Sequence, residues 1–279
     1  MKILLTGATG QVGWELRRTL APLGEVRSLD RFGLDLADAP VIVATVRALQ
    51  PEVIVNAAAY TAVDKAESER EAAFAVNATA PRVLAEEAKR IGAFLVHYST
   101  DYVFDGEKST PYIEDDAARP INVYGESKLA GEQAILRSGC RHLVLRTSWV
   151  YGPRGRNFYL TMLRLARERP ELKVVDDQVG APTSSLEIAR ATAALLEKRA
   201  QGLYHMAAAG ETSWCGFARA LLQRAGIATP VAAIRTEDYP APAKRPRNSR
   251  LDCSRLRADC GVALAPWEEQ LSEVTLVAR

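Results

Sequence analysis

The chain has 279 residues, of which 48% are hydrophobic and 25% are charged, and its formal net charge is +2. This composition is typical of an ordinary soluble globular protein, and so small a net charge excludes a generally basic nucleic-acid or membrane-surface protein. No apolar run approaches the ~20 residues that cross a bilayer, and Gly7 and Gly10 interrupt the N-terminal run before it resembles a signal peptide.

The cysteines and histidines of the chain are scattered. They have no Cys-x-x-Cys spacing, and no two histidines are close enough in sequence to predict a metal site. These residues are Cys140, Cys215, Cys253, Cys260, His97, His142 and His205. Four thiols in a chain of this size favour a reducing compartment, so we expect a cytoplasmic protein that holds no metal through these residues.

The first predicted element is a short buried strand over residues 2–6, because three apolar residues follow one another there. A turn with the spacing Gly7-x-x-Gly10-x-x-Gly13 comes next, and residues 14–20 predict a helix. Strand, glycine turn and helix together are typical of the phosphate-binding turn of a doubly wound sheet. The positive end of the helix then faces a pyrophosphate, so we expect a nicotinamide dinucleotide here.

A second predicted strand, over residues 25–29, ends at Asp30. A carboxylate at this position accepts both hydroxyls of an adenosine ribose and favours NAD, whereas the guanidinium of Arg31 suits the 2′-phosphate of NADP. Asp35 and Leu36 fall where a loop contacts the adenine. A helix over residues 40–49 and a strand over residues 53–55 follow. Residues 56–61 are mostly small, which allows the cofactor to pass close to the end of that strand.

Strands and helices continue to alternate along the chain. Residues 64–77 and 81–90 read as helical, 94–98 as a strand, 127–136 as a helix and 142–146 as a strand. This alternation predicts an α/β fold, namely a Rossmann-type doubly wound parallel sheet with helices on both faces. We place the NAD(P)-binding domain at residues 1–149.

After residue 149 the pattern is less regular. We expect helices over 157–167, 186–199, 214–225 and 267–277, short strands over 172–175 and 203–206, a turn at 180–183, and an irregular segment around Pro240, Pro242 and Pro246. Residues 150–279 are therefore predicted to form mainly a smaller substrate-binding lobe over the carboxyl ends of the strands. The helical residues 184–200 are expected to return to the first domain.

Tyr124 and Lys128 have the spacing Tyr-x-x-x-Lys. Residues four apart share a helix face, which places the ammonium near the phenol. A nearby cation lowers the pKa of a phenol, and a phenol tuned toward neutrality passes a proton to or from a sugar oxygen. Thr100 and Ser99 are rival hydroxyls for the substrate carbonyl, because successive strand residues point to opposite faces.

These residues resemble those of the extended short-chain dehydrogenases/reductases. More narrowly, six segments spread over nearly the whole chain are similar to the dTDP-4-dehydrorhamnose reductase family. They are NAAAYTAVDKAE (56–67), STDYVFDG (99–106), YGESKLAGE (124–132), RTSWVYG (146–152), DQVGAPT (177–183) and RPRNSRLD (245–252). The resemblance implies that NADPH or NADH reduces the 4-keto group of dTDP-4-dehydro-L-rhamnose to give dTDP-L-rhamnose, a cell-envelope sugar donor.

The resemblance also implies roles for individual residues, and it selects Thr100 over Ser99. The implied catalytic residues are Thr100, Tyr124 and Lys128. The implied cofactor contacts are Gly10, Gln11, Val12, Asp30, Asp35, Leu36, Ala59, Tyr60 and Thr61, with Tyr60 replacing a histidine of some members. To these we add Gly7, Gly13, Arg31, Tyr124 and Lys128 as expected cofactor contacts. The implied sugar-nucleotide contacts are Thr100, Asp101 and Trp149.

Some members of this family dimerise through a Mg²⁺ ion held by carboxylates. Glu15 and Glu268 match that pattern, but Leu186 occupies the position of the third acid and Glu187 lies one residue away. The set of ligands is therefore incomplete for Mg²⁺ in this chain.

Residues 244–250 carry four cations in seven residues, and their proline excludes a regular helix. One interpretation is a solvated run of charges. The other is a clamp on the substrate diphosphate by Arg245 or Arg247, with Asn248 holding the shape of the loop. The family resemblance supports the clamp.

Two other functions stay open at the level of sequence. A sugar-nucleotide epimerase of the same superfamily keeps its NAD bound through a closed cycle, and a related protein is the non-catalytic regulatory subunit of methionine adenosyltransferase. The complete set of Thr100, Tyr124 and Lys128 favours an enzyme over a binding subunit. We expect a small nucleotide sugar as the partner, no nucleic acid or membrane, and a monomer or homodimer.

Overall fold

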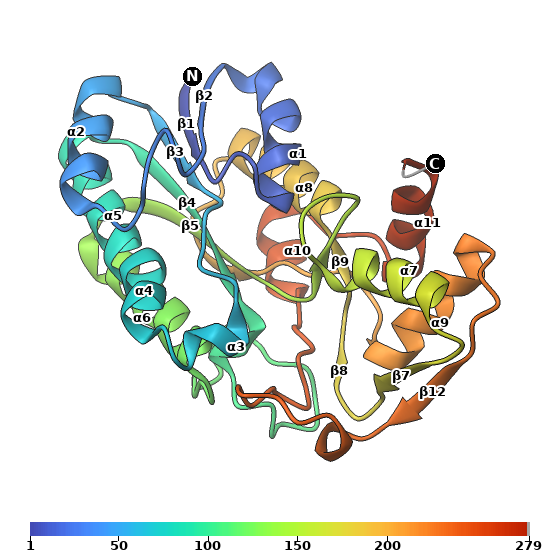
Figure 1. Ribbon diagram of the computed structural model, residues 1–279. Helices are drawn as coiled ribbons and strands as arrows, with labels where there is room; N and C mark the ends of the chain where they lie inside the picture. Colours follow the sequence, from blue (N-terminus) through green and yellow to red (C-terminus); the bar gives the residue numbers. More distant parts are fainter. Residues whose placement is uncertain (278–279) are drawn as a thin grey trace.

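A six-stranded parallel sheet forms the centre of the protein, with the strand order β10-β5-β4-β3-β1-β2 (Figure 1). The computed structural model describes residues 1–277. The strands are β1 (Lys2–Thr6), β2 (Glu25–Leu29), β3 (Val53–Asn56), β4 (Phe94–Thr100), β5 (Arg141–Thr147) and β10 (Gly202–His205). All neighbouring strands pair in parallel, so the predicted Rossmann-type sheet is confirmed.

Helices cover both faces of this sheet. The helices α1 (Gln11–Thr19) and α8 (Ser185–Glu197) pack on one face, and α2 (Ala39–Leu49), α5 (Ala80–Ile91) and α6 (Val123–Ser138) pack on the other. Successive strand residues point to opposite faces, so Ile3 and Leu5 belong to the first core and Leu4 to the second. Because both faces are buried, the strands are nearly continuous apolar runs.

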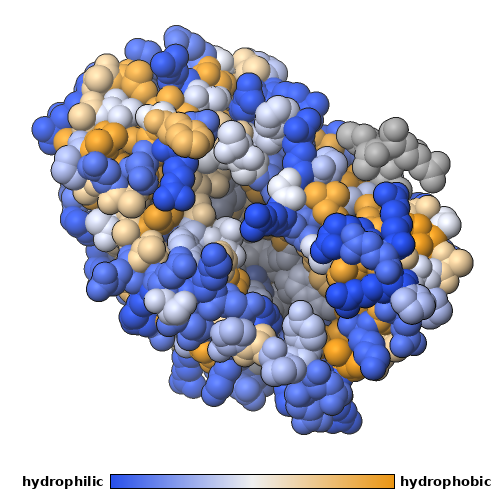
Figure 2. Space-filling model, viewed as in Figure 1, coloured by the Kyte–Doolittle hydropathy of each residue, from blue (hydrophilic) through white to orange (hydrophobic). Residues whose placement is uncertain are grey.

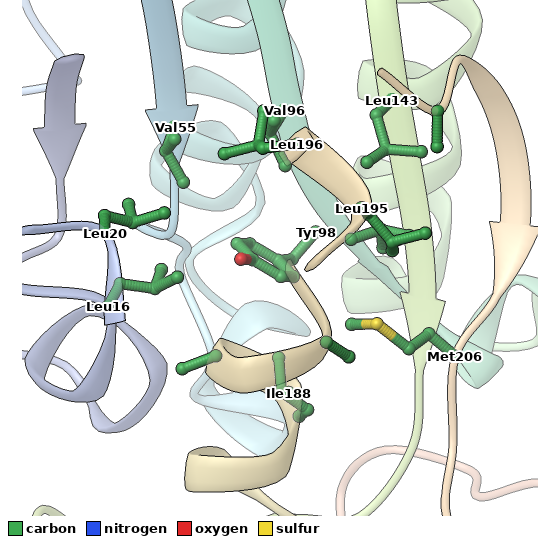
Figure 3. Packing of buried hydrophobic residues seen from close by; sticks show 14 of the residues in the cluster. Leu16, Leu20, Val55, Val96, Tyr98, Leu143, Ile188, Leu195, Leu196 and Met206 are labelled. Carbon is green, nitrogen blue, oxygen red and sulfur yellow. The ribbon is translucent and has the colours of Figure 1, made fainter. Parts of the chain in front are cut away.

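Figure 3 shows the first of these cores from close by. Leu16 of α1 and Ile188 of α8 are directed toward strand residues that include Val55 and Tyr98. The hydroxyl of Tyr98 is satisfied inside this core by the Thr192 hydroxyl at 2.8 Å. The helix α8 is thus anchored to the sheet by packing and by a buried hydrogen bond, and the next strand, β10, extends the sheet beside β5.

A smaller lobe lies beside the carboxyl ends of the strands, on the right of Figure 1. It contains α7 (Phe158–Glu168), α9 (Trp214–Ala225), α11 (Trp267–Val277) and the parallel pair β7 (Leu172–Val175) and β12 (Val231–Ile234). Two short pairs join segments of this region: β8 (Val179–Gly180) with β11 (Thr212–Ser213), and β6 (Val150–Tyr151) with β9 (Thr183–Ser184). The lobe has its own apolar core, centred on Tyr159, Phe217 and Leu221.

Several expected elements differ from those observed. The helix expected over 64–77 is wrong as one element, because it is divided into α3 (Val63–Ala66), α4 (Arg70–Phe74) and a π-helical segment (Ala75–Thr79). Between α3 and α4, the amides of residues 68 and 69 both donate to the Lys65 carbonyl. The helix α6 begins at Val123, four residues earlier than expected, because the Asn122 side chain caps it by accepting from the Gly125 amide.

The remaining differences concern short elements. The sequence patterns did not predict β12 or α10 (Ser254–Cys260), and the turn expected at 180–183 contains the ends of β8 and β9. Short 3₁₀ turns also occur at Ala21–Leu23, Asp101–Val103 and Thr236–Asp238. Within residues 1–277, no helix combines the length and the apolar character needed to span a membrane.

Candidate active site

The candidate site lies at the carboxyl ends of the parallel strands. These ends meet at one edge of the sheet, where ligands bind in open α/β folds. Figure 2 shows the surface hollowed between the sheet, on the left, and the smaller lobe, on the right. The glycine turn after β1, the Tyr60 loop after β3 and Thr100 at the end of β4 all face this edge.

The glycine turn fits a diphosphate. Gly7 has φ +68°, and a Cβ on it would lie 2.6 Å from the Ala58 backbone nitrogen. A Cβ on Gly13 would lie 2.1 Å from the Gly7 carbonyl oxygen, so only glycine lets α1 start this close to β1. Gly10 is the N-cap of α1 and brings no capping side chain, which leaves the first-turn amides to an anionic group.

Other expected cofactor contacts line the same edge. Gln11 of α1 accepts a hydrogen bond from the Asn157 side chain at 2.7 Å, which ties the loop before α7 to the glycine turn. Val12 packs against the first core. Leu36 is buried, and the Asp35 carboxylate accepts from the Ala37 amide at 2.9 Å.

The end of β2 carries the two residues that bear on the choice of cofactor. One carboxylate oxygen of Asp30 accepts from the amides of Phe32 and Gly33, both at 3.0 Å. Asp30 therefore shapes the turn, and its second oxygen is left for a ligand. The Arg31 side chain is exposed beside it.

The segment Ala59, Tyr60 and Thr61 follows β3 and is held by Asn77. The Asn77 side chain accepts from the Tyr60 amide at 2.8 Å and donates to the Tyr60 carbonyl at 3.0 Å and to Ser127 Oγ at 3.0 Å. Asn77 lies in the π-helical segment, a distortion that recurs at functional sites. The Tyr60 hydroxyl donates to Glu69 at 2.6 Å, and this bond raises the pKa of Tyr60 to about 12.

The structure brings Thr100 and Tyr124 together. Tyr124 lies in the first turn of α6, close enough to Thr100 for that hydroxyl to lower the pKa of the phenol. Gly125 permits this approach, because a Cβ there would lie 2.1 Å from the Tyr102 carbonyl oxygen. Ser99, the rival hydroxyl, precedes Thr100 on the strand and is buried with no hydrogen-bond partner in the described part of the chain.

The expected effect of Lys128 on the phenol is wrong. The Lys128 ammonium turns to β4, where it donates to the Tyr98 carbonyl at 2.6 Å and lies 3.3 Å from His97 Nε2. Burial raises the pKa of Tyr124 to about 12, against the nearby Thr100 hydroxyl, which lowers it. Burial also lowers the pKa of Lys128 to about 8, although the charge of Glu132 opposes that change. The Tyr124 phenol therefore keeps its proton at neutral pH.

Asp101 lies beside this pair. Its carboxylate accepts from the Thr100 hydroxyl at 3.1 Å, and its other oxygen is buried without a hydrogen-bond partner among residues 1–277. Burial raises the pKa of Asp101 to about 6, with smaller lowering effects from the nearby Ser249 and Thr100 hydroxyls. A buried oxygen without a partner is costly, which marks this position as one that a ligand hydroxyl can satisfy.

Trp149 is held rigidly at the mouth of the lobe. It has φ +48°, a left-handed backbone conformation that is rare for an aromatic residue and is often found at functional sites. Its ring stacks on Trp214, with centroids 3.6 Å apart and an interplanar angle of 10°. Trp149 is only 9% exposed, and the edge of its ring lies against Gly180.

The basic segment 244–250 divides its charges among several partners. Arg245 pairs with Asp64 at 2.8 Å, and Arg250 pairs with Glu211 at 2.9 Å. Asn248 donates to the carbonyls of Lys108 and Thr110 at 2.6 and 2.8 Å, so it holds the shape of the loop. In the part of the chain that the structure describes, the exposed Arg247 guanidinium has no recorded partner.

The candidate carboxylates for Mg²⁺ are not gathered into a cluster. Glu15 pairs with Arg18, and Glu187 pairs with Arg190 at 3.0 Å. Over residues 1–277, no group of three or more potential metal ligands comes together.

Sequence reasoning missed several residues that shape this site. They are Asn56, Asn77, His97, Gly180 and Trp214. Two of these residues carried a signal in the sequence. Asn56 is a polar residue at the end of an apolar strand, and His97 is a polar residue inside one. Nothing local distinguishes Asn77, because its role depends on the π-helical segment.

Fold and site together define the chain as an extended short-chain dehydrogenase/reductase. The parallel sheet, the glycine turn, the Thr100–Tyr124 contact and the lysine one helical turn further on are the features of that class. The chain belongs to the family described as the RmlD substrate binding domain, whose model matches residues 1–278.

Named relatives agree with this assignment. The chain is 48% identical to the dTDP-4-dehydrorhamnose reductase of Escherichia coli and 51% identical to that of Burkholderia thailandensis, in each case over 96% of this chain and 95% of the relative. The structure of a dTDP-4-dehydrorhamnose reductase from Clostridium acetobutylicum superposes with a TM-score of 0.97 at 39% identity, covering 99% of both chains. That of the Bacillus anthracis enzyme in complex with NADP gives 0.96 at 37% identity, covering 99% of this chain and 100% of that one.

Proposed function

We propose that this protein reduces the 4-keto group of dTDP-4-dehydro-L-rhamnose to dTDP-L-rhamnose, with NADPH or NADH as the reductant. The observation that carries the proposal is the closeness of the Thr100 hydroxyl to the Tyr124 phenol at the edge of the sheet, one helical turn from a buried Lys128. The relatives named for this reaction cover nearly the whole chain, which supports the choice of substrate.

The chain supplies the proton and the hydrogen bonds of this reaction. The nicotinamide cofactor supplies the hydride when it is bound. As charge grows on the substrate carbonyl oxygen, the Thr100 and Tyr124 hydroxyls donate hydrogen bonds to it, and Tyr124 then transfers its proton. A phenol whose pKa is raised to about 12 keeps that proton until the oxyanion forms. Lys128 turns away from the phenol, so its expected role here is to bond the nicotinamide ribose.

The cofactor is placed by the first half of the chain. The glycine turn and the α1 amides receive the diphosphate, and Asp30 and Arg31 flank the adenosine ribose. Asp30 retains one carboxylate oxygen for the ribose, while Arg31 is exposed and suits a 2′-phosphate, so both NADH and NADPH are expected to serve.

The substrate is placed mainly by residues of the second half. The oxygen of Asp101 that has no partner among residues 1–277 accepts from a sugar hydroxyl, and Trp149, held against Trp214, borders the nucleotide sugar. Arg247 is the arginine of the basic segment that is free for the diphosphate, while Arg245 and Asn248 shape the loop. We retain the division into a cofactor domain at 1–149 and a substrate lobe within 150–279, with helix α8 and strand β10 returning to the first. The four free thiols support a cytoplasmic location.

The decisive experiment measures oxidation of NADPH and of NADH with dTDP-4-dehydro-L-rhamnose, and compares the UDP-linked sugar. We expect consumption of reductant that depends on the dTDP-sugar and that is lost in Tyr124→Phe. An epimerase would copurify with NAD and turn over its substrate without added reductant. Capture of a methionine adenosyltransferase without any consumption of reductant would instead identify a regulatory subunit.

A further inference from the structure

Three buried polar side chains form a row across the central strands. Thr6 of β1, Asn56 of β3 and His97 of β4 are neighbours in the strand register, and each is 1% exposed. The row one step earlier on the same face is apolar, with Leu4, Ile54 and Leu95 in the same positions. The polar row is therefore a specific feature of the carboxyl ends of these adjacent strands (Figure 1).

The row is a continuous hydrogen-bonded chain. Thr6 Oγ1 lies 2.7 Å from the Asn56 amide oxygen, and the Asn56 amide nitrogen lies 3.1 Å from His97 Nδ1. His97 Nε2 lies 3.3 Å from Lys128 Nζ. Because Thr6 directly precedes Gly7, this chain extends from the glycine turn to the buried lysine of the candidate active site.

The positions of the protons along this hydrogen-bonded row depend on the charge of Lys128. A charged Lys128 has only donors, so it needs a lone pair on His97 Nε2, and the proton of the neutral imidazole must then be on Nδ1. Asn56 meets that proton with its amide oxygen, because a half-turn of the amide exchanges oxygen and nitrogen while keeping both contacts. A neutral Lys128 accepts from His97 Nε2 instead, and Asn56 then donates to Nδ1.

We propose that His97 is a positioning residue for Lys128. Its Nε2 lone pair accepts a hydrogen bond from the ammonium, and Asn56 and Thr6 hold the imidazole tautomer that leaves this lone pair free. The role of Lys128 in the reaction rests on the proposed reductase function. The hydrogen bond itself does not, since it is a property of the free protein. His97 touches neither substrate nor cofactor in this proposal and acts only through the lysine.

The other charges near Lys128 are accounted for by their own partners. Glu132, one turn along α6, bonds Arg146 of β5 at 3.0 and 2.8 Å, so its charge is shared with a guanidinium. Tyr124 lies one turn before the lysine, with Asp101 beside it. The outer helices direct their charges elsewhere, in the pairs Arg70–Glu126, Asp64–Arg245 and Arg47–Glu87. The π-helical segment against α6 brings Asn77, which does not titrate. His97 is therefore the side-chain acceptor that β4 offers to the ammonium beside the Tyr98 carbonyl, and its loss leaves that carbonyl alone to hold the charge.

The test compares two amides that each replace one nitrogen of the imidazole. The longer side chain of His97→Gln reaches the position of Nε2, whereas that of His97→Asn reaches only Nδ1. Burial already lowers the pKa of Lys128 to about 8. In His97→Leu and in His97→Asn we expect its titration midpoint to fall by about one further pH unit. In His97→Gln it stays close to that of the parent protein.

The midpoint is read by NMR titration of the Lys128 side chain in the free protein, with the resonance assigned by its loss in Lys128→Met. The same shift is expected in the basic limb of the kcat/KM profile. His142→Gln is the matched control, because His142 lies on β5 and bonds the Cys140 carbonyl at 2.9 Å. It should leave the Lys128 midpoint unchanged.

The outcomes separate the two proposals. Equal midpoints in His97→Asn and His97→Gln, or a parent-like midpoint in a folded His97→Leu, overturn the positioning role. If His97→Leu does not fold, the comparison of the two amides decides. A parent protein that titrates as expected but does not consume reductant overturns the proposed function and leaves the His97 assignment intact.

Discussion

The substitution Gly180→Ala tests whether the position of Trp149 governs substrate binding. A Cβ at Gly180 would lie 2.6 Å from Trp149 Cε2 and 2.9 Å from both Cζ2 and Nε1. The indole has little freedom to move away, because Trp214 stacks on it at 3.6 Å. Gly180 is not at positive φ, so the substitution acts through this contact and not through backbone strain.

The expected magnitude follows from the same geometry. Overpacking of a well-packed site costs ~1–3 kcal/mol, and loss of an aromatic pair costs ~0.5–1.5 kcal/mol. Since a chain of this size loses ~2 °C of Tm per kcal/mol, we expect Tm to fall by ~2–6 °C. A displaced indole should also raise the KM for the dTDP-sugar about tenfold, which corresponds to ~1.4 kcal/mol.

The assay is steady-state kinetics with the dTDP-sugar, together with titration of NADPH by fluorescence. We expect the affinity for NADPH to stay at the parent value. Gly226→Ala is the control, because Gly226 has φ +68° and nothing within 4 Å of an added Cβ. It should cost ~1 kcal/mol through the backbone and leave KM unchanged. A lower Tm in Gly180→Ala with an unchanged KM would show that Trp149 serves only the packing of the lobe.

Three further predictions concern the proposed chemistry. Tyr124→Phe should lower kcat ~100- to 10,000-fold and leave the NADPH dissociation constant unchanged; a parent-like kcat would remove the phenol from the mechanism. Because the pKa of Lys128 is lowered to about 8 in the folded protein, kcat/KM should fall as the pH rises through that value. Between about pH 8 and the ordinary lysine pKa of 10.5, Lys128 binds more protons in the unfolded chain than in the folded protein. The contribution of Lys128 to the free energy of unfolding should therefore rise with pH over this range, and denaturation measured at several pH values checks the sign. Arg247→Ala should weaken dTDP binding by about tenfold and flatten its salt dependence, whereas Arg250→Ala, which removes a guanidinium already paired with Glu211, should not; equal affinities in both variants and the parent would dismiss the clamp.

Much of the fold could be predicted because its signals are local. Short stretches of sequence are enough to predict the apolar strands β1, β3 and β4 and the glycine turn after β1. The elements that were missed are those that depend on a distant partner. The strand β12 pairs with β7, more than fifty residues earlier, and α10 follows an irregular segment with no capping side chain.

The site divides in the same way. The sequence by itself determined the glycine turn, the Tyr124–Lys128 spacing and the family to which they belong, because these depend on residues a few positions apart. Only the tertiary structure decided that Lys128 turns away from the phenol toward Tyr98 and His97, which lie 30 and 31 residues earlier. It likewise decided that Arg245 pairs with Asp64, 181 residues away. Such partners are set by which strands and loops are brought together in packing, and no periodicity along the chain encodes them.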